Sequence, residues 1–309
     1  MSDLPGPILV TGANGQLGRR LLRRLHAASR PCRALVRSQR AADSLADVCG
    51  ETGTPVEIVD YRDAAGLTEA ARGCDAAVHL VGILKETRAN PYADAHERPS
   101  QALATAADAV GLRRVVALSI LGSRPDSDNA CLASKGRAEE ILLAAKTPAV
   151  VIRVPMVLGE GDPASQALAR QAGGGRVRLV CGGATREQPI AATDVVSAIV
   201  AALDAPDPGD SALDLAGPES LSHRELVERA ARVLGTEVEF GSIPLPVARG
   251  FAWLASRLSA DPPLTPAMLG VLEHDDDIDP APACRALGIE LTPLDEALRL
   301  VLSPQENGA

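Results

Sequence analysis

The sequence predicts an α/β fold: a doubly wound parallel sheet joined to a smaller, helix-rich C-terminal lobe. Two observations lead to this prediction. An apolar strand near the N-terminus runs through a glycine-spaced turn into a helix, and short β-type segments then alternate with helical patterns. Such alternation is typical of a parallel sheet with helices on both faces. After Pro155 the pattern changes, because glycines at 159, 161 and 173–175 break the chain into loops.

The first element combines a strand, a turn and a helix. The apolar run at residues 8–10 suits a strand that is buried on both faces. The glycines that follow let the backbone turn tightly and approach a pyrophosphate, and the next helix offers its N–H groups and positive dipole end to the phosphates. The arrangement predicts the dinucleotide site of a Rossmann fold, with these cofactor-binding residues: Gly12, Asn14, Gly15, Gln16, Leu17 and Gly18.

The alternation continues along the chain. We expect strands at 33–36, 56–59, 76–81, 114–118 and 149–153, and helices near 39–48, 63–72, 93–110 and 130–146. A helix at 193–204 and a strand at 212–215 are expected to rejoin this domain. In such sheets the ligand lies beyond the carboxyl ends of the strands. The residues at these ends are therefore further candidates for the site: Arg37, Asp60, Leu80, Val81, Gly82, Ser119, Val154 and Pro155.

The sheet and its helices are predicted to form an NAD(P)-binding domain over residues 1–218, with 160–186 contributing to the second lobe. The C-terminal lobe, which would meet a substrate or a partner, then spans 219–309. It opens with a capping box formed by Ser222 and Glu225, which predicts the start of a helix.

The segment 245–258 allows two interpretations. It places the aromatic residues Phe251 and Trp253 between Arg249 and Arg257. A helix with this pattern either packs its apolar face inward or lies at an interface with a membrane or a partner. In a chain with few aromatic residues we expect the inward packing.

Charge and composition exclude several classes of protein. The formal net charge of −9 and the lack of a basic cluster argue against a nucleic acid or an anionic membrane as a partner bound through overall charge. Six scattered cysteines without a C-x-x-C pair fit reduced thiols in the cytoplasm better than disulfides or a zinc site, so no metal is expected. The acidic run at 274–279 is expected to be a solvated loop. No apolar run reaches the length of a transmembrane helix, so we expect a cytoplasmic protein, peripheral to a membrane at most.

The end of the second strand indicates which dinucleotide is bound. NAD is usually held there by an acid that accepts from the ribose hydroxyls, whereas the 2′-phosphate of NADP attracts a cation. This chain has Arg37 and no acid, so NADP(H) is the expected cofactor and NAD(H) the alternative. An ordinary solvated arginine is the other interpretation of Arg37. Asp60 and Tyr61 are candidates for the adenine side, although Asp60 could instead cap the next helix.

Several short motifs carry a resemblance to a known family. Those that resemble an extended or atypical short-chain dehydrogenase/reductase are Thr11-Gly12-x-x-Gly15-x-x-Gly18, Ser119, Lys135, Arg153-Val154-Pro155 and Gln188-Pro189-Ile190. A narrower resemblance, to the branch containing the NAD(P)H-binding accessory subunit of mitochondrial complex I and its bacterial relatives, is carried by Leu35-Val36-Arg37, the run from His79 to Leu84, Pro262-Pro263-Leu264-Thr265 and Leu287-Gly288-Ile289. The resemblance covers nearly the whole chain.

The resemblance implies a catalytic set that this chain holds incompletely. In active relatives a serine polarises the substrate oxygen, a tyrosine transfers its proton, and a lysine holds the nicotinamide ribose. Ser119 and Lys135 match, but Cys131 stands where the tyrosine belongs. The shorter thiol should not reach a substrate, and we expect a small buried residue or, as the alternative, a nucleophile favoured by Lys135. Tyr92 would have to lean in from another helix to replace the phenol.

Two main functions follow. The first is a protein that binds NADP(H) as a structural or sensory cofactor within a respiratory or quinone-linked complex, as the resemblance implies. The second is an oxidoreductase or epimerase that acts on a quinone, a lipid-like molecule or a sugar nucleotide through a displaced proton donor or a water. A cofactor-sensing regulator is a third alternative. The missing tyrosine favours the first function.

Overall fold

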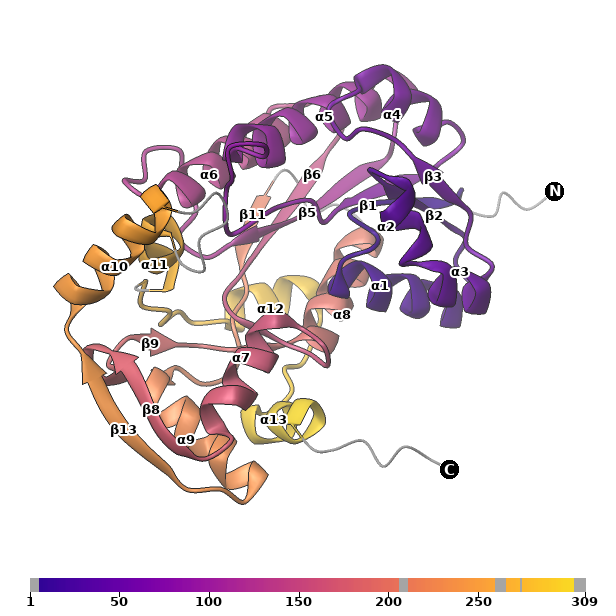
Figure 1. Cartoon of the computed structure of the whole chain (residues 1–309). Coiled ribbons are helices and arrows are strands. Elements are labelled where there is room, and N and C mark those ends of the chain that lie inside the picture. The colour runs from indigo at the N-terminus through magenta and orange to yellow at the C-terminus, as the bar shows by residue number, and fades with distance from the viewer. Residues whose placement is uncertain (1–5, 206–210, 259–264, 273, 303–309) are drawn as a thin grey trace. The chain divides into compact units, whose positions relative to one another are not determined.

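The computed structural model describes residues 6–205, 211–258, 265–272 and 274–302 (Figure 1). The chain divides into two units. The first comprises Met1–Arg153 and Val196–Leu213, and the second comprises Val154–Val195 and Asp214–Ala309. The motif residues Pro262, Pro263 and Leu264 lie outside the described part of the chain.

The first unit is built on a seven-stranded sheet, which confirms the predicted α/β class. Its strand order is β11-β6-β5-β4-β1-β2-β3. The strands are β1 (Ile8–Thr11), β2 (Cys32–Val36), β3 (Val56–Ile58), β4 (Ala76–His79), β5 (Arg114–Ile120), β6 (Ala149–Val154) and β11 (Ser211–Asp214). β1 pairs in parallel with both β2 and β4, so the winding of the chain reverses between β1 and β4. A ligand of such a sheet binds where this reversal occurs.

Helices cover both faces of this sheet. In Figure 1, α4, α5 and α6 lie along one face, and α1 and α3 lie on the other. The helices are α1 (Gln16–Ala27), α2 (Gln39–Asp43), α3 (Ala46–Thr52), α4 (Ala64–Ala71), α5 (Arg98–Val110), α6 (Ala130–Leu143) and α8 (Ala192–Asp204). β1 is buried on both faces, because Ile8, Leu9 and Val10 are all at most 1% exposed. This burial is what its unbroken apolar run predicts.

Two predicted helices differ from the structure. The helix expected at 39–48 is divided into α2 and α3, because the hydroxyl of Ser44 donates to the carbonyl of Ala41 and ends α2. The helix expected at 93–110 begins as a π-helical turn, η1 (Ala93–Glu97), before α5. Pro99 has no N–H to donate to the preceding turn, which explains why regular α-helical bonding is interrupted there.

The second unit has its own core and several short strand pairs. Leu168, Leu226 and Leu298 are buried together between α7 (Pro163–Ala172), α9 (His223–Leu234) and α13 (Leu294–Leu302). The remaining elements are β7 (Val157–Leu158), β8 (Gly175–Val180), η2 (Cys181–Gly183), β9 (Arg186–Glu187), β10 (Ile190–Ala191), β12 (Leu221–Ser222), β13 (Val238–Ile243), α10 (Leu245–Leu258), α11 (Pro266–Leu272) and α12 (Ala281–Leu287). The capping box of Ser222 and Glu225 is present at the start of α9, as predicted.

Within the second unit, Arg186 contacts two acids of the acidic run at 274–279. The backbone N–H of Arg186 donates to Asp275, and its guanidinium forms an ion pair with Asp277 at 3.3 Å. Within the described ranges no cluster of His, Cys, Asp and Glu could hold a metal ion. None of the helices described is long and apolar enough to cross a membrane.

Candidate functional site

The turn after β1 can be made only by glycine. Gly12 has a φ of +72°, in the left-handed region, and a Cβ there would lie 3.0 Å from the carbonyl of Leu80. A Cβ on Gly18 would lie 2.5 Å from the carbonyl oxygen of Ala13, so α1 could not pack against the turn. Gly15 is the N-cap of α1; no side chain caps this helix, and its first turn contains no acid. The N-terminus of α1 therefore favours an anion.

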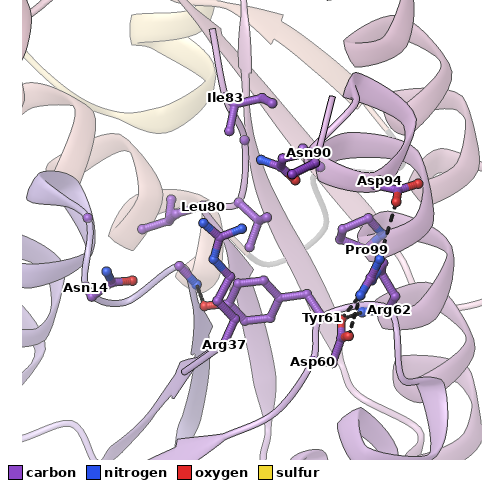
Figure 2. Close-up of a pocket in the computed structure, with 16 residues that line it drawn as sticks. Asn14, Arg37, Asp60, Tyr61, Arg62, Leu80, Ile83, Asn90, Asp94 and Pro99 are labelled. Atoms are coloured by element: carbon purple, nitrogen blue, oxygen red, sulfur yellow. Dashed lines mark hydrogen bonds and ion pairs between the residues drawn. The ribbon is translucent and has the colours of Figure 1, made fainter. Parts of the chain in front are cut away.

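A pocket of about 580 Å³ opens beside this turn (Figure 2). It brings together these predicted residues: Gly12, Asn14, Gly15, Arg37, Asp60, Tyr61, Leu80, Val81 and Gly82. It also contains residues that the sequence did not indicate: Arg62, Ile83, Ala89, Asn90, Asp94, Ala95 and Pro99. Arg62 follows two of the predicted residues directly in the sequence and could have been found from that position. The others come from the loop after β4, from η1 and, in the case of Pro99, from the first turn of α5. The sequence does not define the course of the loop.

The remaining predicted residues lie elsewhere. Gln16, Leu17 and Gly18 form the first turn of α1 and do not line the pocket. Ser119 and Lys135 line a hollow of about 10 Å³ beside Val81. Val154 is the last residue of β6 and Pro155 follows it, where the division into units falls.

Arg37 has an exposed side chain that faces the pocket. Across the described residues, its guanidinium has no hydrogen bond or ion pair, whereas neighbouring arginines are bound to acids. In Figure 2 it lies next to the ring of Tyr61. A planar cation in this setting can bind a phosphate through two N–H groups at once.

A second cation in the pocket, Arg62, is already neutralised. Its Nε and Nη2 donate to the two oxygens of Asp60 at 3.0 and 2.7 Å, and its Nη1 lies 3.3 Å from Asp94 (Figure 2). Hydrogen bonds from Arg62 lower the pKa of Asp60 to about 2. Asp60 is therefore a carboxylate that can still accept from an adenine amino group. It does not cap the next helix, because Asp63 caps α4.

The floor of the pocket covers a buried polar cluster. The ammonium of Lys135 donates to the carbonyls of Val81 and Leu118 at 3.4 and 3.3 Å, and burial lowers its pKa. A Cβ on Gly82 would lie 2.7 Å from this ammonium, so glycine lets Lys135 approach the pocket. Burial, with a smaller contribution from the charge of Lys135, lowers the pKa of both His79 and His96 to about 3. Both histidines are therefore neutral at physiological pH.

The two side chains that could transfer a proton are bound to the loop after β4. The thiol of Cys131 is fully buried and donates to the carbonyl of Ile83 at 3.6 Å. The phenol of Tyr92 donates to the next carbonyl, that of Leu84, at 2.8 Å, and its ring stacks on His96. Burial raises the pKa of Cys131 and that of Tyr92, so both groups keep their protons.

The free helix terminus, the glycine turn and Arg37 fit the pyrophosphate and the phosphorylated ribose of a dinucleotide. Residues 12–206 match the family described as NAD(P)H-binding. The chain belongs to this family. The family match and the sequence resemblance agree on the type of cofactor.

Among the family's curated relatives, the chain is 29% identical over 252 residues to a mitochondrial protein of Arabidopsis thaliana, "NADH dehydrogenase [ubiquinone] 1 alpha subcomplex subunit 9". The match covers 79% of this chain and 61% of the relative, so the chain spans about three fifths of that protein. It is 28% identical over 250 residues to a ceramide reductase of Caulobacter vibrioides, covering 79% of this chain and 76% of the reductase. The resemblance to the complex I accessory subunit is thereby confirmed.

Solved structures share the fold. The UDP-glucuronic acid 4-epimerase of Bacillus cereus, solved with UDP-glucuronic acid and NAD, aligns with a TM-score of 0.74. The alignment covers 96% of this chain and 98% of the epimerase at 16% sequence identity. At this identity the likeness establishes the epimerase-like fold and nothing about the substrate.

The buried histidines predict a pH dependence of stability. The folded-state pKa of His79 is lowered to about 3, below its usual value of about 6.5. Between these values the unfolded chain binds a proton that the folded chain does not, so the free energy of unfolding falls as the pH decreases from 6.5 towards 3. We expect His79→Gln to make this fall shallower by about 1 kcal/mol per pH unit.

Urea unfolding at intervals between pH 6 and 4 measures this slope. The control for loss of a histidine is His26→Gln, on the exposed side of α1. Equal slopes for His79→Gln and the wild-type protein would contradict the prediction.

Proposed function

We propose that this chain binds NADP(H) and holds it with little turnover, as a structural or sensory cofactor of a respiratory or quinone-linked complex. One observation carries the proposal. A pocket shaped for a dinucleotide lies over a loop whose neighbouring thiol and phenol are both buried and bound to backbone carbonyls. Binding features and proton donors are thus separated within the same unit.

The preference for NADP(H) rests on Arg37. Its guanidinium faces the pocket from the end of β2, the usual place of the acid that accepts from the ribose hydroxyls of NAD. Arg62 and Asp60 neutralise each other, so Arg37 is the cation that a 2′-phosphate would meet. Two parallel N–H donors and a full charge make this contact strong.

Low turnover rests on Cys131 and Tyr92. A bound reduced nicotinamide would supply a hydride, and a carbonyl substrate would then need a proton from the protein. Cys131 has a short side chain whose proton is directed to Ile83, and Tyr92 directs its proton to Leu84. Because burial raises both pKa values, neither group is a ready acid.

A surface of the second unit supports attachment to a membrane beside such a complex. Val247, Phe251 and Leu254 follow one another along α10 at helical spacing and are 49–60% exposed, so the expectation that these side chains pack inward is wrong. Next to them lies Trp253, with the guanidinium of Arg257 5.2 Å from its ring centre. Exposed apolar side chains beside arginines are typical of helices that lie in an anionic lipid surface. We propose that α10 contacts a membrane through these side chains.

A reductase of a lipid-like substrate is the second candidate. It is favoured by the similarity to a ceramide reductase and by the position of Tyr92, whose phenol interacts with the thiol of Cys131. Because Tyr92 lies next to Cys131, which stands where the catalytic tyrosine belongs, a local rearrangement would let its phenol supply the proton. The epimerase-like fold keeps a sugar nucleotide among the substrates to be tested.

The cofactor preference is tested with Arg37→Asp. We expect the wild-type protein to bind NADPH at least about tenfold more tightly than NADH, because a charged hydrogen bond contributes about 1.5–3 kcal/mol. In the variant the order should reverse, since a carboxylate repels the 2′-phosphate and accepts from the ribose hydroxyls. Titration calorimetry measures both constants. A wild-type preference for NADH would remove the basis of the assignment.

The low turnover is tested by following NADPH oxidation with a short-chain quinone, a long-chain ketone and a UDP-sugar. We expect no rate above that of NADPH alone, in the wild-type protein and in Cys131→Ala. Steady oxidation that persists in Cys131→Ala and is lost in Tyr92→Phe would instead establish the second candidate.

The membrane contact is tested by sedimentation with vesicles of phosphatidylcholine and phosphatidylglycerol. We expect binding that falls at least about tenfold in the double variant Phe251→Ser, Trp253→Ser, since burial of each aromatic side chain contributes about 1.5–3 kcal/mol. Leu300→Ser, which changes an equally exposed apolar residue outside α10, is the control. Unchanged sedimentation of the double variant, or none for the wild-type protein, would rule out this contact.

A further inference from the structure

The hydroxyl of Tyr61 bridges two segments that form the pocket. Tyr61 follows β3 and is 8% exposed. Its hydroxyl accepts a hydrogen bond from the backbone N–H of Gly12 at 3.0 Å and donates one to the carbonyl of Leu35 at 2.9 Å. One phenol therefore connects the glycine turn after β1 with the end of β2.

This bridge supplies a bond that the backbone does not make. β1 ends at Thr11, and the positive φ of Gly12 turns the chain out of the sheet. The N–H of Gly12 is left without a strand partner at a partly buried position, where an unpaired donor is unfavourable. A phenol can accept there and donate elsewhere at the same time, whereas phenylalanine can do neither.

The bridge also limits how the turn can move. The N–H of Ala13 lies 3.4 Å from the same carbonyl of Leu35, so two contacts hold the turn against β2. On the other side of the turn, the backbone of Leu80 leaves no room for a Cβ on Gly12. The turn is thus held between β2 and the end of β4, and α1 starts four residues after Gly12.

Burial keeps this phenol protonated. Its pKa is raised to about 12, since desolvation outweighs the hydrogen bond from Gly12 and the nearby charge of Arg37. At physiological pH it therefore stays both donor and acceptor.

We propose that Tyr61 is a positioning residue for the pyrophosphate: its hydroxyl holds the glycine turn so that the N-terminal N–H groups of α1 face the phosphates before the cofactor arrives. This rests on the proposed function and assigns the hydroxyl a task apart from any contact between the ring and adenine. Preorganisation of this kind increases affinity because the bound shape need not be formed during binding.

Tyr61→Phe removes the hydroxyl and keeps the ring, so it tests the hydroxyl alone. The probes are ADP-ribose, which contains the pyrophosphate, and 2′-AMP, which has the adenine and the 2′-phosphate but no pyrophosphate. We expect Tyr61→Phe to weaken ADP-ribose and NADPH by about three- to tenfold, the range of one hydrogen bond, and to change 2′-AMP less than twofold. Arg37→Ala should give the opposite pattern, with 2′-AMP weakened and ADP-ribose unchanged.

Thr68→Val is the control for loss of a hydroxyl in the same unit, because Thr68 donates to the carbonyl of Ala64 within α4, away from the pocket. It should bind all three ligands like the wild-type protein. If Tyr61 only stabilised the fold, Tyr61→Phe would lower the unfolding temperature and leave the dissociation constants of NADPH and ADP-ribose unchanged. That result, or an equal loss for ADP-ribose and 2′-AMP, would overturn the proposal.

Should Tyr61→Phe fail to fold, hydrogen exchange in the wild-type protein decides. We expect the N–H of Gly12 to exchange slowly without ligand, and exchange as fast as in an unfolded peptide would overturn the bridge. If the wild-type protein binds neither NADPH nor ADP-ribose, the proposed function fails together with this inference. If it binds both and Tyr61→Phe binds them equally well, only the inference fails.

Discussion

A backbone turn with no room for side chains is the constraint on which the rest of the first unit depends. The turn must pass close to Leu80 at the end of β4 and must let α1 pack against Ala13, and both approaches require glycine. Because β1 lies between β2 and β4, this turn meets the ends of both neighbouring strands. The pocket follows from that meeting: the N-terminus of α1, Arg37 from β2 and the loop after β4 surround one cavity.

Much of this could be read from the sequence because it depends on local patterns. The glycine spacing, the apolar run of β1 and the alternation of strands and helices each reflect the conformation of a few neighbouring residues. Parallel strands bring their ends to one edge, so Arg37, Asp60 and Gly82 could be placed near each other without knowledge of side-chain contacts. The family and the fold followed from the same patterns.

The rest depends on contacts between distant segments. The hydroxyl of Tyr61 reaches a backbone group 49 positions away, which no periodic pattern encodes. The carboxylates beside Arg62 come from the end of β3 and from a π-helical turn that exists because Pro99 interrupts regular bonding. Lys135, a predicted cofactor-binding residue, lies beside Gly82 of the pocket and next to two buried histidines, and the sequence gives no sign of these histidine neighbours.

The loop after β4 supports the proposal that the cofactor is bound with little turnover. Lys135, Cys131 and Tyr92 hold the carbonyls of Val81, Ile83 and Leu84 in turn, so groups that resemble a catalytic set serve to shape a wall of the pocket. A crystal structure of the protein with NADPH tests this most directly. We expect the pyrophosphate at the N-terminus of α1, the 2′-phosphate on Arg37, and both buried donors still bound to the loop. An empty glycine turn, or a phenol hydroxyl beside the nicotinamide ring, would contradict a protein that holds its cofactor without reacting.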